Sequence, residues 1–199
     1  TDKDFLYLPL ASPLPFAFGG DRAGDNLFAN SIVAVDIHSG EYRWHFQTIH
    51  HDLWDHDPPA PPTLFDIDLG GRTLPALAAT TKSGYLFLLN RITGEAIFGV
   101  EERTVPASPL DAEAASPTQP IPVSPPPMAR VSFNLDDIVR ADSTSPEHAS
   151  ACAALVAQLG EIFNEGPYTP WTLRDENGSG GTTLLFPGLA GGPNWGGVA

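Results

Sequence analysis

Two segments of the chain share one pattern of apolar and polar positions. Residues 30–46 (NSIVAVDIHSGEYRWHF) and 83–100 (SGYLFLLNRITGEAIFGV) each hold an apolar strand, a polar pair, a Gly-Glu turn and a second strand that ends in aromatic residues. In each, Asp36 or Asn90 leads into a tight turn closed by glycine, which adopts a positive φ at little steric cost. The pattern therefore predicts two β-hairpins.

A hairpin that recurs after about 50 residues is typical of β-propeller blades, because each small sheet buries its faces only against its neighbours. We therefore expect an all-β fold that forms part of a propeller. Two copies are also what unrelated hairpins in another β protein would give, so the repeat alone leaves that alternative open.

The repeat is interrupted at about residues 106–166. Residues 106–127 carry too many prolines for a sheet interior and are expected to run extended over the surface, either as a partner surface or as a loop wrapped over the propeller. Ser-Pro-Glu at 145–147 then offers an N-cap, a first-turn proline and an early acid before apolar residues at helical spacing. These signals predict one helix of about four turns, ending near Gly166. Residues 1–199 are interpreted as one partial propeller domain with this insertion.

Composition narrows the possible partners. With 42% hydrophobic residues the chain can bury one core, and 24 acidic against 10 basic residues give a formal charge of -14, which disfavours nucleic acid as a partner. The single cysteine, Cys152, excludes an internal disulfide framework and is expected to be an ordinary buried residue. Neither a leader peptide nor a membrane-spanning run is visible, and both ends stop in strand-like sequence. We therefore expect a piece of a longer chain, whose other segments would hold any leader or anchor.

The densest group of polar residues is HHDLWDHDPPA at residues 50–60. A histidine-ligated metal site is disfavoured, because adjacent histidines on a strand cannot both face one ion and two prolines follow. On an extended strand Asp55 and Asp57 would project to one side, and Trp54 and His56 to the other. Two carboxylates on one side can hold a hard cation, or one can act as a base beside the other. The alternative is a pair of solvated loop carboxylates in an acidic protein.

The runs NSIVAVDIHSGEYRWHFQTIHHDLWDHDPPAPPTLFDI and LPALAATTKSGYLFLLNRITGEAIFGVEERTVPAS resemble the dehydrogenases that depend on pyrroloquinoline quinone (PQQ), and most of all their membrane-bound glucose, quinate and polyol branch. GGDRAGDNLFANS, SPTQPIPVSPPP and LLFPGLAGGPNWGG are also similar to that branch, and all motifs occur in the same order. The resemblance implies an eight-bladed propeller with PQQ in its axial funnel, of which this chain supplies about three blades. It also implies a periplasmic, membrane-associated enzyme that oxidises a sugar, polyol or cyclic alcohol and passes electrons to a membrane quinone.

The resemblance assigns roles to several residues. Asp55 matches the general base, which takes the proton of the alcohol, and Lys82 matches the cation that hydrogen-bonds the quinone oxygens. Taken alone, Lys82 would be a solvated surface cation. Asn194 matches a cofactor donor, while Trp195 either contacts the cofactor or packs between blades. Calcium or a similar hard cation is expected, with Asp55 and Asp57 among its ligands and its strongest ligand outside the chain.

Four further residues complete the expectations. His51 and Asp52 either orient the base and line the substrate pocket, or form a buried structural pair. Trp44 matches the tryptophan that pins adjacent blades together. Ser12 stands where methanol-type relatives have a calcium-binding asparagine, and a hydroxyl is a weaker ligand than an amide oxygen.

Two other functions compete with the dehydrogenase. A propeller of the same repeat type without quinone would serve as a binding scaffold, but it would not be expected to keep Asp55 and Lys82 at this spacing. A truncated product could not close the ring, so by itself this chain is not expected to turn over substrate without the remaining blades.

Overall fold

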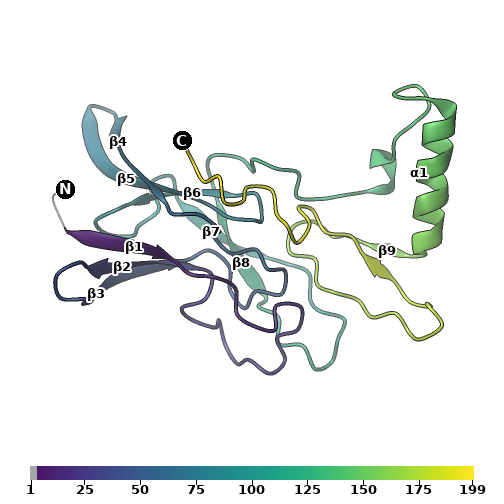
Figure 1. Cartoon of the computed structure of the whole chain (residues 1–199), viewed down its shortest axis with the longest axis horizontal. Coiled ribbons are helices and arrows are strands. Elements are labelled where there is room, and N and C mark those ends of the chain that lie inside the picture. Colours follow the sequence, from purple (N-terminus) through teal and green to yellow (C-terminus); the bar gives the residue numbers. More distant parts are fainter. Residues whose placement is uncertain (1–3) are drawn as a thin grey trace.

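The computed structural model describes residues 4–199, which form short antiparallel sheets arranged in series (Figure 1). Two three-stranded sheets come first, in the order β1-β2-β3 and β4-β5-β6, and a two-stranded sheet β7-β8 and a small parallel pair β9-β10 follow. The strands are β1 (Phe5–Pro9), β2 (Ser31–Asp36), β3 (Tyr42–Gln47), β4 (Thr63–Leu69), β5 (Arg72–Thr80), β6 (Leu86–Asn90), β7 (Val100–Thr104), β8 (Thr118–Pro122), β9 (Ile162–Phe163) and β10 (Thr182–Thr183).

The two predicted turns have the same hydrogen bonds, which confirms the repeat. In each turn the N–H of the first residue donates to a carbonyl five residues later, and the N–H of the glycine donates back to the first residue. The glycines have φ of 73° and 79°. All four bonds measure 2.8 Å: Asp36 to Glu41, Gly40 to Asp36, Asn90 to Glu95 and Gly94 to Asn90. The second hairpin is shorter than expected, because β6 meets its return segment at only one bridge, between Leu89 and Ala96.

Trp44 joins the first two sheets, as expected. The indole of this β3 residue is buried, and its Nε1 donates to the carbonyl of Arg91, 3.3 Å away, beyond the end of β6. A Cβ added to Gly94 would lie 2.7 Å from the indole ring, so the turn of the second sheet packs directly on it. The hydroxyl of Tyr7 donates to the same carbonyl at 2.8 Å. The largest fully buried apolar side chains are Trp54, Phe87, Ile32, Ile49, Leu53, Leu77 and Leu89.

The proline-rich segment differs from the expectation. Its residues 118–122 are β8, which pairs with β7 instead of running over the surface, and Gln119 within it is fully buried. Pro120 and Pro122 are tolerated because the sheet has only two strands, so a missing N–H costs little pairing. The segment therefore contributes to the interior near residues 50–60.

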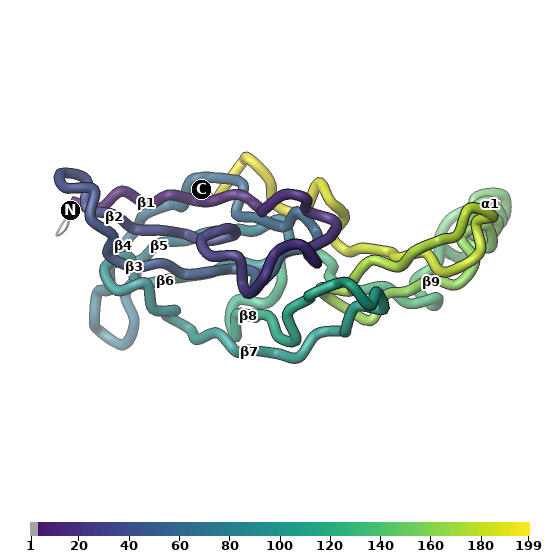
Figure 2. The backbone as a smooth tube through the Cα atoms, turned by 90° about the horizontal axis from the view of Figure 1, so that it is seen from below, coloured from purple at the N-terminus to yellow at the C-terminus, as the bar shows by residue number. Residues whose placement is uncertain are grey.

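The predicted helix is present as α1 (Pro146–Leu159), capped by the hydroxyl of Ser145, which accepts from the N–H of His148. It ends at Gly160, which has a φ of 71°, and not near Gly166. None of its residues is buried, and α1 and β9 project away from the other sheets (Figures 1 and 2). Cys152 is therefore partly exposed, contrary to the expectation that it is buried.

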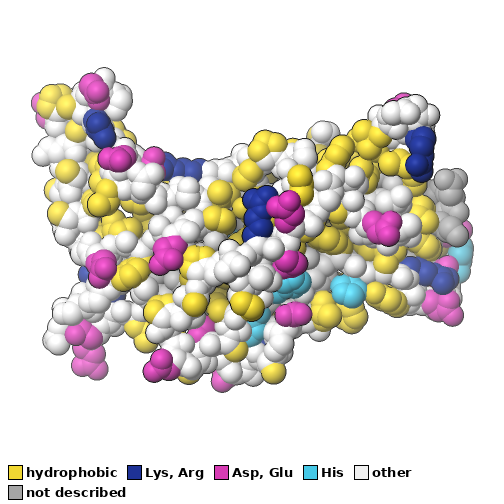
Figure 3. All heavy atoms as spheres, turned by 180° about the vertical axis from the view of Figure 1, so that it is seen from behind, with side chains coloured by type: hydrophobic (Ala, Val, Ile, Leu, Met, Phe, Trp, Pro, Cys, Tyr) yellow, Lys and Arg dark blue, Asp and Glu magenta, His cyan; other side chains and the backbone are white. Residues whose placement is uncertain are grey.

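The sheets described in residues 4–199 do not close into a ring, which is the arrangement of a partial propeller. Apolar patches lie between scattered acidic side chains on the face shown in Figure 3. Within the same residues, no helix combines the length and apolar character needed to span a bilayer. The C-terminal tail returns to the second sheet, where the Thr63 hydroxyl donates to the carbonyl of Val198.

Candidate functional site

The segment that follows β3 is an irregular loop, so the expected alternation of a strand is wrong. His51 and Asp55 have φ of 48° and 58°, in the left-handed region that costs strain for residues other than glycine. This geometry nevertheless brings Asp55 and Asp57 toward the same partner, Lys82. The carboxylates converge because the loop turns, and not because of strand periodicity.

Lys82 is the centre of the site. It lies in the short loop between β5 and β6, and its side chain is only 14% exposed. Nζ donates to Asp55 Oδ2 at 2.9 Å and lies 2.8 Å from Asp57 Oδ1, as an ion pair. The N–H of Lys82 donates to the carbonyl of Asp57 at 3.1 Å. Both the backbone and the side chain of Lys82 are therefore held by the loop that carries the carboxylates.

Burial and the neighbouring carboxylates act on the pKa of Lys82 in opposite directions. Burial lowers the pKa of Lys82, but the hydrogen bonds and charges of Asp57 and Asp55 outweigh burial, and the pKa lies above its usual range. One ammonium faces two carboxylates, so the cluster retains a net negative charge. A group that lost its partner here would be left charged in a partly buried place.

The predicted cofactor residues surround one hollow of about 350 Å³. Asp55, Lys82, Asn194 and Trp195 line it together with Leu189 and Ala190, although they come from three distant parts of the sequence. Asn194 Nδ2 donates to the carbonyl of Ala190 at 2.7 Å, which leaves its second amide hydrogen and its oxygen available. Trp195 is 85% exposed at the rim, so within residues 4–199 it does not pack between sheets.

Gly191, a glycine of the C-terminal tail, lies against Lys82. A Cβ added to Gly191 would lie 2.6 Å from Cβ of Lys82, and the N–H of Gly192 donates to the carbonyl of Lys82 at 3.0 Å. Gly196, on the other side of Asn194, has no neighbour within 4 Å of an added Cβ. The tail is therefore anchored on the lysine of the site.

Asp52 has the burial and hydrogen bonds of a structural residue. Its carboxylate is completely buried and accepts from the amide of Asn30 at 2.8 Å and from the hydroxyl of Ser12. It also accepts from the N–H groups of Trp54, at 2.8 Å, and His56, at 3.1 Å. The Ser12 hydroxyl is thus directed at a carboxylate of the protein.

His51 is likewise buried and does not line the hollow. Its Nδ1 lies 2.7 Å from the carbonyl of Gly24 and therefore carries the hydrogen. Its Nε2 faces the carboxylate of Glu113, which the sequence did not identify. His56 is also buried, which lowers its pKa against the opposing charge of Asp52, and its Nε2 lies 3.2 Å from the carbonyl of Gly188.

The described residues do not by themselves form a metal site. Within residues 4–199, no group of three or more histidine, cysteine, aspartate or glutamate side chains is placed to hold an ion. Calcium takes about six to eight oxygen ligands, and Asp55 and Asp57 offer two carboxylates whose partner is Lys82. Their net negative charge suits a cation, but most of its ligands would have to come from elsewhere.

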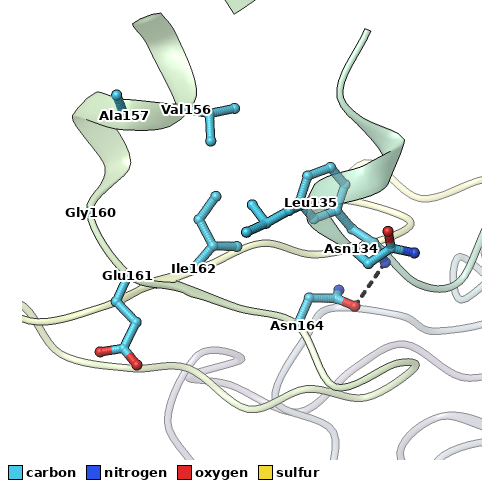
Figure 4. A pocket seen from close by; sticks show the side chains of 9 residues that line it. Asn134, Leu135, Val156, Ala157, Gly160, Glu161, Ile162 and Asn164 are labelled. Atoms are coloured by element: carbon cyan, nitrogen blue, oxygen red, sulfur yellow. Dashed lines mark hydrogen bonds between the residues drawn. The ribbon is translucent and has the colours of Figure 1, made fainter. Parts of the chain in front are cut away.

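A larger hollow of about 470 Å³ lies beside α1 (Figure 4). Its lining is mostly apolar, and in it the N–H of Phe133 donates to Asn164 Oδ1 at 2.9 Å. It contains one ionisable side chain, Glu161, and none of the predicted site residues. The hollow at Lys82 is smaller, but the convergent charged groups lie there.

Antiparallel sheets in series, closed by the same glycine turn and joined by a buried tryptophan, define a segment of a β-propeller. Residues 1–199 match the family model described as PQQ: Glucose/ethanol/alcohol dehydrogenase, beta-propeller domain, and the chain belongs to this family. The family match confirms the all-β propeller class.

Curated relatives agree over nearly the whole chain. It is 35% identical over 200 residues to the quinoprotein glucose dehydrogenase of Escherichia coli K12 and 33% identical over 199 residues to a probable quinate dehydrogenase (quinone) of Xanthomonas campestris pv. juglandis, with 98% of the chain aligned to each. It is 30% identical over 207 residues to the glycerol dehydrogenase large subunit of Gluconobacter thailandicus.

The chain spans 23%, 23% and 26% of the length of these three relatives, respectively. Among solved structures, a quinohemoprotein alcohol dehydrogenase from Comamonas testosteroni aligns with 61% of this chain and 18% of its own, at 28% identity and a TM-score of 0.45.

Proposed function

We propose that this chain contributes the base and the main cationic cofactor contact of a PQQ-dependent dehydrogenase that oxidises a sugar, a polyol or a cyclic alcohol. The observation that carries the proposal is the convergence of Asp55, Lys82 and Asn194 on one hollow. A carboxylate, an ammonium and an amide at one place supply a proton acceptor, a positive charge and a hydrogen-bond donor.

Asp55 acts as the general base. Its Oδ2 accepts a hydrogen bond from Nζ of Lys82, and within residues 4–199 no hydrogen bond is made to its Oδ1. This oxygen is free to accept the proton of an alcohol bound in the hollow. With 33% of its side chain exposed, Asp55 can meet a substrate while one oxygen remains fixed.

The residues present fit PQQ, a flat, anionic quinone. Lys82 would hold its oxygens through the ammonium, Asn194 would donate its remaining amide hydrogen, and the exposed Trp195 has a free aromatic face. When bound, the quinone would accept the hydride from the alcohol carbon. Lys82 holds a positive charge where negative charge develops, while Asp55 takes the proton. Asp55 and Asp57 would be partial ligands of calcium or a similar cation.

The wider setting is proposed by analogy with the named relatives. Electrons would pass to a membrane quinone, in a periplasmic, membrane-associated protein whose remaining blades lie in a longer chain. The substrate class follows from relatives named for glucose, quinate and glycerol, which all carry secondary or cyclic hydroxyl groups.

The test uses the full-length protein that contains this chain, titrated with PQQ in the presence of calcium and assayed by dye-linked oxidation of a sugar, polyol and cyclic alcohol panel. Lys82→Ala should weaken PQQ binding, and Asp55→Asn should keep PQQ while losing turnover. Arg103→Ala and Asp66→Asn are the matched controls, because each removes the charge of an exposed side chain that forms an ion pair outside the hollow.

Two results would contradict the proposal. A wild-type protein that ignores PQQ at every calcium concentration would indicate a binding scaffold with inherited architecture. If Asp66→Asn reduced turnover as strongly as Asp55→Asn, Asp55 would have no special role as the base.

A further inference from the structure

Strand β8 contacts the start of the loop formed by residues 50–57 through Gln119. This side chain is completely buried and forms two hydrogen bonds with the backbone of His50. The N–H of His50 donates to Oε1 at 2.8 Å, and Nε2 donates to the carbonyl of His50 at 2.7 Å. The carboxamide thus pairs with both backbone groups of one residue, as a neighbouring strand would.

Glu113 contacts the next residue of the loop. Its carboxylate is 2% exposed and accepts from the N–H of Gly19 through both oxygens, at 2.9 and 3.1 Å. Oε1 also lies 3.8 Å from Nε2 of His51, whose Nδ1 faces the carbonyl of Gly24. The imidazole is therefore hydrogen-bonded on the Nδ1 side and enclosed on the Nε2 side, where a Cβ added to Gly19 would lie 2.0 Å from Nε2.

Fixing His50 and His51 matters because the loop is strained. His51 and Asp55 both have positive φ, and such conformations persist only where the surrounding contacts impose them. Between these two residues, Asp52 binds the N–H groups of Trp54 and His56, which makes the loop one hydrogen-bonded unit. A displacement at its start would therefore be transmitted to Asp55.

We propose that Gln119 and Glu113 are positioning residues for Asp55, acting through His50 and His51. The proposal rests on the proposed role of Asp55 as the base. Neither residue lines the hollow at Lys82, so their removal should affect turnover more than the binding of substrate or PQQ. The proline-rich segment thereby gains a function inside the protein.

The test compares three variants of the full-length protein. Gln119→Met keeps the length of the side chain and removes both hydrogen bonds to His50. Glu113→Gln keeps an acceptor for Gly19 and removes the charge that faces His51. Tyr7→Phe is the control, because it removes one 2.8 Å hydrogen bond to a backbone carbonyl in a different part of the fold.

Two kinds of measurement are made. The first is amide hydrogen exchange in the peptide that covers residues 50–57, and the second is kcat and KM for an alcohol that the protein oxidises. In Gln119→Met, exchange in this peptide should accelerate about tenfold or more, with a smaller rise in Glu113→Gln and none in Tyr7→Phe. In both Gln119→Met and Glu113→Gln, kcat should fall about tenfold or more, while KM stays within about twofold of the wild-type value. Glu113→Gln provides the result if Gln119→Met does not fold.

The outcomes separate the two proposals. Exchange in residues 50–57 that matches Tyr7→Phe, or a kcat that stays at the wild-type value despite faster exchange, would overturn the positioning role. If exchange is faster in the variants but the wild-type protein oxidises no alcohol, the contacts that hold Asp55 in place would be supported and the proposed dehydrogenase activity would be refuted.

Discussion

The contact between the C-terminal tail and Lys82 predicts a specific effect of Gly191→Ala. Gly191 has a φ of 81°, and an added Cβ would lie 2.6, 2.7 and 2.8 Å from Cβ, Cγ and Cα of Lys82. None of these three atoms is the mobile end of the lysine, so the side chain cannot relieve the overlap by changing the position of its ammonium alone. The tail must move away from the loop that carries Lys82.

The cost follows from two contributions. A residue other than glycine in the left-handed region costs about 1–2 kcal/mol, and inserting a methyl group into occupied space costs about 1–3 kcal/mol. If the tail detaches to avoid this cost, the hydrogen bond from Gly192 to Lys82 is lost and Asn194 leaves its place. The lower end of the combined cost, about 2 kcal/mol in the arrangement that binds PQQ, corresponds to about 30-fold weaker binding.

The assay is a PQQ titration of the full-length protein, with the melting temperature of the unliganded protein measured beside it. Gly196→Ala is the control, because it lies in the same tail with no neighbour within 4 Å of the added Cβ. We expect a loss of affinity in Gly191→Ala and almost none in Gly196→Ala. Equal affinity in the two variants would refute the reasoning that the tail is held in place by Lys82.

Three further predictions concern stability. Burial raises the pKa of Tyr85 and Tyr168, so as the pH rises the unfolded chain loses these two protons before the folded protein does. The free energy of unfolding should therefore be constant below pH about 10 and fall above it. Tyr85→Phe should reduce that fall, as measured by denaturant titrations at each pH. Asp36→Asn should leave the melting temperature almost unchanged, because Asn90 accepts the corresponding backbone hydrogen bond in the second turn. Asp36→Ala removes this acceptor and should lower the melting temperature. Equal melting temperatures of the two variants would contradict this prediction. Gly94→Ala should destabilise more than Gly40→Ala, because both strain a positive φ but only the first meets an indole ring, at 2.7 Å; equal free energies of unfolding would exclude the contact.

The sequence predicted what local chemistry determines. The turns were predictable because glycine and a short polar side chain fix their geometry within six residues, and Trp44 was predictable from the resemblance to the family. The helix was predicted, but its end was wrong: Gly160 and Gly166 both have positive φ, and only the first lies where α1 stops. The residues of the hollow were found through resemblance to a family, because nothing in the spacing of Lys82 and Asn194 alone places them together.

The supporting contacts could not be predicted, and their physical reason is distance along the chain. Gln119 stands in a proline-rich run that reads as surface, and its burial depends on β7 and on a loop about 70 residues away. Asp52 and Asp55 are chemically identical, so only the fold shows that one is enclosed by donors while the other faces a hollow. The strand assumed for residues 50–57 failed because tertiary contacts impose positive φ at two residues without a sequence signal.

These contacts also divide the site into what this chain determines and what it does not. Each residue from His50 to Asp57 has a hydrogen bond or ion pair to the described residues, formed by Gln119, Glu113, Ser12, Trp171, Thr169, Gly188 and Lys82 among others. The geometry of Asp55 and Lys82 is therefore set within residues 4–199. By contrast, two carboxylates are too few for a calcium site, and one side of the hollow is open at Trp195. Substitutions in the anchors of the loop should therefore act on turnover, whereas the choice of ion and alcohol should depend on residues that complete the open side.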